Sequence, residues 1–393
     1  MKIAIIEIDY HPEVLKNMCN ILDDTFMEIT FYTTEKIYKQ VNDEHVFEKF
    51  NWVYFSEDES LKAFFLYHKE NINSSDIVFF NTLASNFRFF SAFEFTGKKI
   101  LRVHNTNAYF SPANNYFPKW TLFYLFKDVS HIIRKTIFSL DWYYRKKFIE
   151  TVDYFVFADE KLREYAIDEM LINKEKTLAS IPLAHYSECY EKSKKTHEVV
   201  VTIPGAIDPR RKDYDMLYNA LKIASPKFDA PVKIYFLGKA NGKYANFVKR
   251  MFKSLESKSL FISFYKDRVP QSTFSSVLKS TDFLTLPLKI ETRYTIYTER
   301  YGFTKISGGI NDMIHYGKPC VLTSLYPLSN ELKQVTGQYS SVNEFAEIMI
   351  DWVNNRKFVE YQKNVALSLK NYEKGQLKVK IEQIFSSITS EHN

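Results

Sequence analysis

The sequence predicts an α/β protein of two doubly wound lobes with further helices at the C-terminal end. At 393 residues the chain is longer than one hydrophobic core usually organises. Short β-branched runs alternate with amphipathic segments, a pattern typical of parallel sheets whose crossovers are helices. The alternation stops at a polar stretch and then begins again. We therefore expect two domains, residues 1–195 and 196–393, with a boundary near Lys195.

The first lobe is predicted from its order of apolar runs. Its strands are expected at 2–8, 28–34, 51–56, 76–82 and 98–105, and its first helices at 12–24 and 60–72. After a long irregular and helical stretch come two more extended runs, at 153–159 and 176–183. The charged segment at 185–198 has no periodicity and is typical of a linker.

The second lobe repeats the pattern at similar size. Strands are expected at 198–207, 232–238, 260–265, 282–288 and 319–324, with helices at 215–224, 244–257, 272–280 and 309–316. From Val342 onward the sequence is helical and contains no further strand. These C-terminal helices should pack outside the second sheet, and a return to the first lobe is left open.

Composition excludes several classes of protein. Hydrophobic residues make up 45% of the chain, which suits a globular protein with a large core. Its cysteines, Cys19, Cys189 and Cys320, are too few and too widely spaced for a disulfide framework or a zinc site, so a reducing cytoplasm fits best. No signal peptide or membrane-spanning run is predicted. A net charge of +6 is mild for this length and indicates no nucleic-acid partner.

The stretch from Phe303 to Ser324 is the first candidate site. Apolar residues recur at helical spacing from Ile310 onward, so the helix at 309–316 should begin beside Ser307, Gly308 and Gly309. Free amides and the helix dipole there favour a pyrophosphate. Asp312 lies off the apolar stripe in the first turn, where its carboxylate suits ribose hydroxyls. The alternative is a tight turn with an acid that only complements the dipole.

A basic block supplies a second candidate at the end of the second lobe's first strand. Gly205 lies at the turn, and Arg210, Arg211 and Lys212 come just before a helix. Ligands of open α/β sheets bind at strand carboxyl ends, so these cations should face the same diphosphate as the glycines. The alternative is a solvated basic loop.

These motifs carry a family resemblance. The blocks "PGAIDPRRKDYDMLYNAL", "IYFLGK" and "ISGGINDMIHYGKPCVLTS" resemble the GT-B glycosyltransferases, most closely the family-four-like bacterial enzymes. The resemblance implies two Rossmann-like domains facing a cleft and no cofactor other than the donor substrate. It also implies metal-independent transfer of a sugar, with retention, from a UDP or GDP sugar to a glycan or lipid-linked acceptor in bacterial surface polysaccharide synthesis.

The resemblance assigns roles residue by residue. Arg211 and Lys212 match the pair that holds the diphosphate, and Asp312 matches the acid that binds ribose. The family's other acid falls on Thr304, a departure that puts retention in doubt and makes Glu299 a candidate for the donor-sugar contact. The expected donor site comprises Gly205, Arg210, Arg211, Lys212, Gly238, Thr304, Lys305, Ser307, Gly308, Gly309 and Asp312.

In the first lobe, His104 resembles the family histidine that points at the donor sugar, although a lone histidine is also a common structural hydrogen-bonder. His11 has the equivalent position after the first strand, on the expected acceptor side. The expected catalytic residues are therefore His104, Arg211, Lys212 and Glu299.

The segment 118–148 mixes basic and aromatic residues on a helical pattern. Such a mixture suits an anionic membrane surface, so residues 119–147 are a candidate for peripheral contact with the inner face of the membrane. The alternative is ordinary solvated surface over a helix packed on its core. Two rival functions remain open: a nucleotide-sugar epimerase, and an inactive GT-B subunit that activates a partner.

Overall fold

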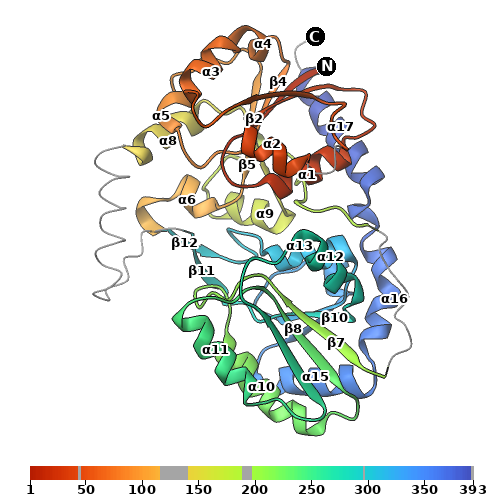
Figure 1. The fold of residues 1–393 in the computed structure, drawn as a ribbon. Helices are drawn as coiled ribbons and strands as arrows, with labels where there is room; N and C mark the ends of the chain where they lie inside the picture. The colour runs from red at the N-terminus through yellow and green to blue at the C-terminus, as the bar shows by residue number, and fades with distance from the viewer. Residues whose placement is uncertain (43–45, 116–139, 188–196, 295–296, 391–393) are drawn as a thin grey trace. The chain divides into compact units, whose positions relative to one another are not determined.

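The computed structural model describes residues 1–42, 46–115, 140–187, 197–294 and 297–390. The chain divides into two compact units (Figure 1). Unit 1 comprises Met1–Leu183, Tyr294–Glu299 and Lys374–Asn393, and unit 2 comprises Ala184–Arg293 and Arg300–Glu373. The boundary expected near Lys195 lies outside the described residues.

Unit 1 is built on a six-stranded sheet in the order β3-β2-β1-β4-β5-β6, with every neighbouring pair parallel. Its strands are β1 (Lys2–Glu7), β2 (Glu28–Thr34), β3 (Asn51–Phe55), β4 (Ile77–Thr82), β5 (Lys98–Val103) and β6 (Tyr154–Phe157). The strand order reverses between β1 and β4. The side chains of β4 are buried throughout, as expected for a strand covered on both faces.

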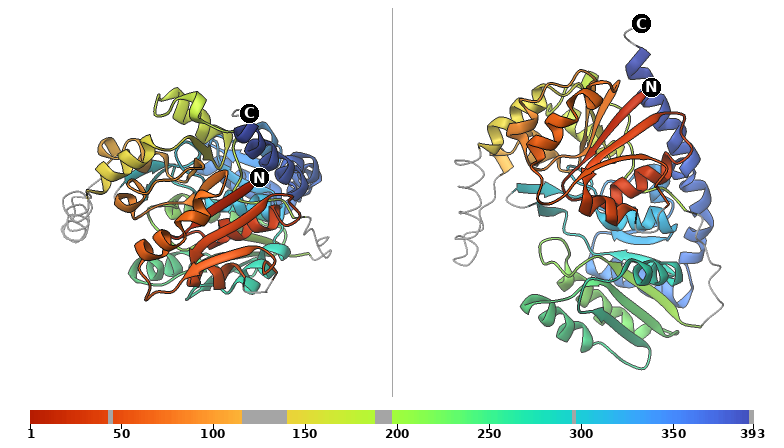
Figure 2. Two further views of the ribbon diagram at one scale, coloured as in Figure 1. Left: turned by 90° about the horizontal axis from the view of Figure 1, so that it is seen from above. Right: turned by 45° about the horizontal axis from the view of Figure 1, so that its top comes forward.

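Helices cover this sheet on both faces. They are α1 (Pro12–Ile21), α2 (Glu35–Val41), α3 (Leu61–Tyr67), α4 (Lys69–Asn73), α5 (Phe87–Phe90), α6 (Thr106–Phe110), α8 (Asp141–Glu150), α9 (Glu160–Asp168) and α17 (Lys374–Ser390). Helix α17 packs Leu377, Ile381 and Phe385 into the same core as β1. Both views of Figure 2 show α17 beside the N-terminal strand.

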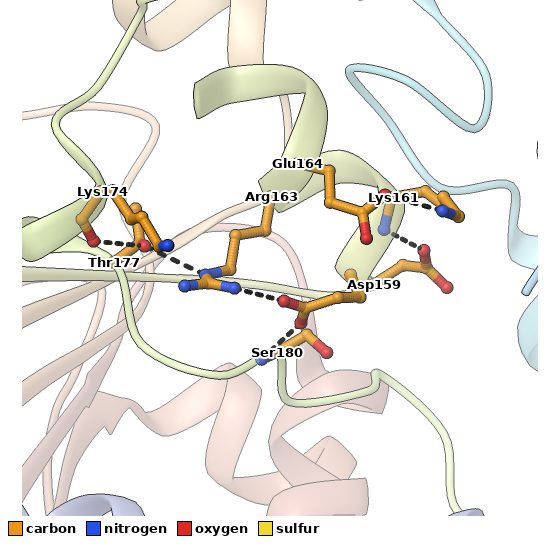
Figure 3. A network of polar contacts seen from close by, with 8 residues as sticks. Asp159, Lys161, Arg163, Glu164, Lys174, Thr177 and Ser180 are labelled. Carbon is orange, nitrogen blue, oxygen red and sulfur yellow. Dashed lines mark hydrogen bonds and ion pairs between the residues drawn. The ribbon is translucent and has the colours of Figure 1, made fainter. Parts of the chain in front are cut away.

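A polar network joins α9 to the segment that follows it (Figure 3). Arg163 donates from Nε to Thr177 Oγ1 at 3.0 Å and pairs with Glu160. Glu160 also accepts from the amide of Ser180 at 3.3 Å. The run expected at 176–183 also lies against β6: the amides of Leu178 and Ile181 each donate at 2.9 Å to the carbonyls of Phe155 and Phe157, and Thr177 forms an isolated bridge with Phe155.

Unit 2 contains a second parallel six-stranded sheet, in the order β14-β13-β10-β7-β8-β9. Its strands are β7 (Val199–Pro204), β8 (Val232–Lys239), β9 (Leu260–Tyr265), β10 (Phe283–Leu286), β13 (Cys320–Thr323) and β14 (Thr336–Tyr339). Its helices are α10 (Tyr214–Ala224), α11 (Lys243–Lys253), α12 (Gln271–Ser280), α13 (Gly308–Tyr316), α14 (Asn330–Lys333), α15 (Val342–Asn354) and α16 (Phe358–Ser368). The predicted fold class, two doubly wound parallel sheets with C-terminal helices, is confirmed.

A short hairpin stands apart from both sheets. It pairs β11 (Glu291–Tyr294) with β12 (Tyr297–Arg300), and the sequence pattern did not predict it. Residues Tyr294–Glu299 belong to unit 1, although the chain on either side of them belongs to unit 2.

Candidate functional site

The carboxyl ends of β7 and β8 meet through two glycines. Gly205 turns the chain after β7 with φ at +87°, in the left-handed region that favours glycine. A Cβ on Gly238 would lie 2.3 Å from the carbonyl carbon of Gly205, so β8 passes directly against the turn. The close approach requires glycine at position 238.

Lys212 is buried under this turn, with 7% of its surface exposed. Its Nζ donates to the carbonyl oxygens of Pro204, at 2.5 Å, and of Gly205, at 2.7 Å. The ammonium group is thus held at the carboxyl edge of the sheet.

Lys212 and Asp312 act on one another electrostatically. Burial lowers the pKa of Lys212 to about 7, and the charge of Asp312 opposes that shift. Burial likewise raises the pKa of Asp312 to about 7, and the charge of Lys212 opposes it. A pair of ionisable groups whose pKa values burial shifts toward neutrality, and whose charges act on one another, is a candidate functional site.

The arginines of the basic block are arranged differently from the lysine. Arg210 is bidentate on Asp208, with N···O distances of 2.9 and 2.7 Å. Arg211 lies 3.6 Å from the same carboxylate, and its side chain is 51% exposed. Burial alone would raise the pKa of Asp208. The hydrogen bonds from Arg210 and the charges of both arginines outweigh burial, so that the pKa is lowered. Sequence reasoning missed Asp208, which orients both arginines.

Helix α13 begins at Gly308, so Asp312 lies just after the first turn rather than within it. Its N-cap, Ser307, makes no side-chain capping hydrogen bond. A Cβ on Gly308 would meet nothing within 4 Å, whereas one on Gly309 would lie 2.4 Å from Leu286 Cδ2. Gly308 therefore leaves open space at the helix start, and Gly309 lets the helix pack on β10.

The loop before α13 is closed by its own hydrogen bonds. Thr304 is fully buried, and its hydroxyl accepts from the amide of Arg300 at 2.6 Å and donates to the carbonyl of Arg300 at 3.3 Å. Lys305 accepts from the amide of Gly302 at 2.8 Å through its carbonyl. Thr304, which stands where the GT-B enzymes that this sequence resembles have an acid, therefore makes its side-chain hydrogen bonds within the loop.

In unit 1, His104 follows β5 and is 6% exposed. Its Nε2 lies 2.8 Å from the carbonyl oxygen of Asn81 and 3.2 Å from Oγ1 of Thr82. The ring of His11 stacks on it, with centroids 4.7 Å apart, and Nδ1 of His11 lies 2.9 Å from Glu13 Oε1. Both histidines lie at the carboxyl edge of the sheet, where the strand order reverses.

Glu299 contributes to the same unit. Its carboxylate is fully buried and accepts from the backbone amides of Asn107, at 3.3 Å, and Ala108, at 2.9 Å, at the start of α6. Asn107 also donates from Nδ2 to the carbonyl of Thr298 at 3.0 Å. Glu299 therefore fixes the turn that follows His104, a contact that its place in the sequence did not indicate.

Only the end of the basic aromatic segment 118–148 belongs to the described residues. Residues 119–139 lie outside the described residues. The expectation that Arg145 adds to a basic surface is wrong, because Arg145 is 4% exposed, pairs with Asp141 and donates to the carbonyl of Ala108. Lys146 and Lys147, by contrast, are exposed.

Within the described part of the chain, no group of three or more His, Cys, Asp or Glu side chains could hold a metal ion. None of the described helices combines the length and apolar character that crossing a membrane requires. A depression of about 470 Å³, lined partly by Lys2, Tyr32 and Trp52, opens at the amino edge of the unit 1 sheet. It lies away from the carboxyl edge, where ligands of such sheets bind.

Comparisons with known proteins bear on the fold. No protein-family model matches the sequence, and no curated protein does. The structure is similar to that of Anabaena Alr3699/HepE in complex with UDP, with a TM-score of 0.63 and 12% identity over 98% of this chain and 100% of that one. It is also similar to the pneumococcal O-GlcNAc transferase GtfA in complex with UDP and GlcNAc (TM-score 0.62, 8% identity, 99% of each chain).

A GtfA/B complex is similar as well, with a TM-score of 0.60 and 10% identity over 99% of this chain and 100% of that one. Identities this low carry information about the fold alone. The two parallel sheets and these likenesses together show that the chain has the GT-B fold.

Proposed function

We propose that the protein is a glycosyltransferase of the family-four-like type, which moves a sugar from a UDP or GDP sugar to a glycan or lipid-linked acceptor. The observation that carries the proposal is the buried Lys212, electrostatically coupled to Asp312, at the carboxyl edge of unit 2. Solved structures of similar fold hold UDP, which supports a nucleoside diphosphate as ligand.

In this proposal the donor diphosphate lies at the start of α13 and is held by the amides of Gly308 and Gly309 together with Lys212 and Arg211. Asp312 accepts hydrogen bonds from the ribose hydroxyls. Because burial lowers the pKa of Lys212 to about 7, a bound diphosphate should draw a proton onto the amine. Negative charge grows on the diphosphate as the sugar leaves, so these donors stabilise the leaving group without a metal.

The remaining roles are proposed from the resemblance and from position. His104 contacts the transferred sugar, and Glu299 keeps the turn after His104 in place by holding two of its amides. Thr304 provides no carboxylate for the donor sugar, so the proposed retention of configuration rests on other groups. The biological setting proposed is surface polysaccharide synthesis at the cytoplasmic face of the membrane.

A second candidate function is that of a GT-B subunit with no transferase activity that binds a partner. The buried Thr304 favours it, because its hydroxyl is engaged with Arg300. Hydrolysis of a nucleotide sugar by the purified chain would argue against this candidate.

The proposal is tested first by nucleotide binding. UDP or GDP should raise the melting temperature more than CMP or dTDP, and Asp312→Ala should weaken that binding. Loss of a charge-assisted hydrogen bond costs about 1.5–3 kcal/mol, roughly a ten- to hundredfold rise in Kd measured by calorimetry. Asp215→Ala, an exposed acid on α10, is the matched control. Equal affinity in Asp312→Ala and wild type would show that Asp312 does not bind the nucleotide. The absence of any nucleotide binding would contradict the proposed function.

Peripheral membrane contact through α8 is a separate part of the proposal. Trp142 and Tyr143 are 47% and 48% exposed, and Lys146 and Lys147 lie on the same helix. A basic residue near an anionic surface contributes about 1 kcal/mol, so Lys146→Gln with Lys147→Gln should weaken binding to phosphatidylserine vesicles roughly thirtyfold in flotation. The exposed pair Lys363→Gln with Lys370→Gln is the control. Unchanged flotation would show that α8 is ordinary solvated surface and makes no membrane contact.

A further inference from the structure

We propose that the depression at the amino edge of the unit 1 sheet is a separate binding site, and that it takes a neutral saccharide. Its volume is about 470 Å³, within the range of about 300–1,000 Å³ that is typical of small-ligand sites. The carboxyl edge of the same sheet, with His11 and His104, is a different place. That the saccharide belongs to a glycan acceptor rests on the proposed function, whereas the binding site itself does not.

The depression is built from two layers of unit 1. Its floor is one face of the sheet: Thr30 of β2 lies opposite Asn51 of β3, and Tyr32 shares the face of Thr30 because side chains alternate along a strand. Its wall is formed by Asn71 of α4 and the residues that lead from α4 into β4. Polar side chains from a sheet and from a helix therefore face one space.

These four side chains have no hydrogen-bond partners in the protein. Among the described residues, no hydrogen bond reaches the hydroxyls of Thr30 and Tyr32. The side-chain amides of Asn51 and Asn71 are likewise unpaired within the described part of the chain. Tyr32 is 2% exposed, and the polar atoms of buried side chains are usually paired. The hydroxyl of Tyr32 thus points to a ligand, which the other three groups are placed to share.

Tyr32 is held in place by its neighbours. Its ring packs against Phe64 of α3 and against His68 at the end of that helix, with centroids 6.5 and 6.1 Å away. Burial raises the pKa of Tyr32, so the phenol keeps its hydrogen at neutral pH and both donates and accepts. A group positioned in this way loses little conformational freedom when a ligand binds.

The charge of the lining favours a neutral ligand. Among the residues that line the depression, the charged ones are Lys2 and Glu28, so their net charge is zero. Lys2 Nζ lies 3.8 Å from Glu28 Oε1, and the two side chains are 53% and 58% exposed. A phosphate or carboxylate would find no uncompensated cation here, and a basic ligand would find no uncompensated acid.

The chemistry of the lining favours a saccharide among neutral ligands. Amide and hydroxyl side chains together donate and accept hydrogen bonds, as the hydroxyls of a sugar do. Val53 adds an apolar part to the floor, which suits the C–H groups of a sugar ring. A lipid chain would instead bury Tyr32 and Thr30 without partners, which costs free energy.

Saturation-transfer difference NMR on the whole chain tests the proposal, with lactose, cellobiose and N-acetyllactosamine as probes. At least one of them should bind at millimolar concentration. Asn51→Ala with Asn71→Ala, at two exposed positions, should weaken that binding about tenfold, because each change removes a hydrogen-bonding group. Tyr32→Phe, which removes only a hydroxyl, should weaken it about fivefold. Gln40→Ala, an exposed amide of α2 outside the lining, is the control and should bind as wild type does.

Three results would overturn the proposal: binding of none of the probes, equal binding by wild type and the double variant, or displacement of the bound probe by inorganic phosphate. Displacement by UDP would also overturn it, because the site would then not be separate from the nucleotide site. Calorimetry with UDP on the same samples reports on unit 2. Loss of nucleotide binding there would contradict the proposed function and leave the saccharide site standing.

Discussion

Lys212→Met should lower the turnover number for sugar transfer by a factor of about 10²–10³ and raise the KM for the donor by much less. The ammonium group is held at the carboxyl edge of β7 by two carbonyl oxygens. In the proposed mechanism its contact with the diphosphate strengthens as the leaving group gains charge, which is why turnover should fall more than affinity. Arg211→Ala should act in the same direction.

Initial rates at saturating and limiting donor measure this effect, with Lys222→Met on the exposed face of α10 as the control. In wild type, UDP affinity should fall as pH rises above about 7, because the free lysine then loses its proton, and Lys212→Met should lose that dependence. EDTA should have little effect. Loss of all activity in EDTA, restored by manganese or magnesium, would contradict the metal-independent mechanism.

Arg145→Met should cost unit 1 about 3–5 kcal/mol of local stability, because removing one partner of a buried ion pair leaves the other uncompensated. The side chain of Asp141 is 12% exposed, and the carbonyl of Ala108 would lose its donor as well. The guanidinium also lies 4.8 Å from the ring centroid of Phe87 and 5.4 Å from that of Tyr297, so packing is lost with the charge.

Hydrogen exchange of the amides in α6 and α8 measures this loss where it arises, which matters because a two-unit chain need not unfold in one step. Lys146→Met, at the exposed neighbouring position, should leave exchange unchanged. Equal protection in both variants would show that Asp141 and α6 are held by other contacts.

Both large sheets were predictable because most of their strands are buried apolar runs whose pattern survives in the sequence. Strand β14 was not predictable, because Thr336, Gly337 and Gln338 have no such pattern. Position 337 requires glycine because of a tertiary contact: a Cβ there would lie 2.9 Å from the indole of Trp352. The hairpin β11–β12 was missed for the related reason that its residues are polar.

The candidate site was predictable only where a local motif marks it. Gly205, Lys212 and Asp312 were predicted from a turn and from helical spacing, and in the structure the charges of Lys212 and Asp312 act on one another. Asp208 was not found, because a carboxylate in a polar loop gives no sign of which cations it will hold. The same holds for Glu299, whose backbone partners lie far back in the sequence.

The packing of α17 has a consequence for biosynthesis. Leu377, Ile381 and Phe385 belong to the same core as β1 and α1, so the part of that core that α17 covers stays open until residues 374–390 have left the ribosome. At about 5–20 residues per second, translation of the intervening unit 2 takes roughly 10–40 s. During that interval the apolar residues that α17 later covers are exposed to chaperones and to other nascent chains, and unit 2 is free to fold first.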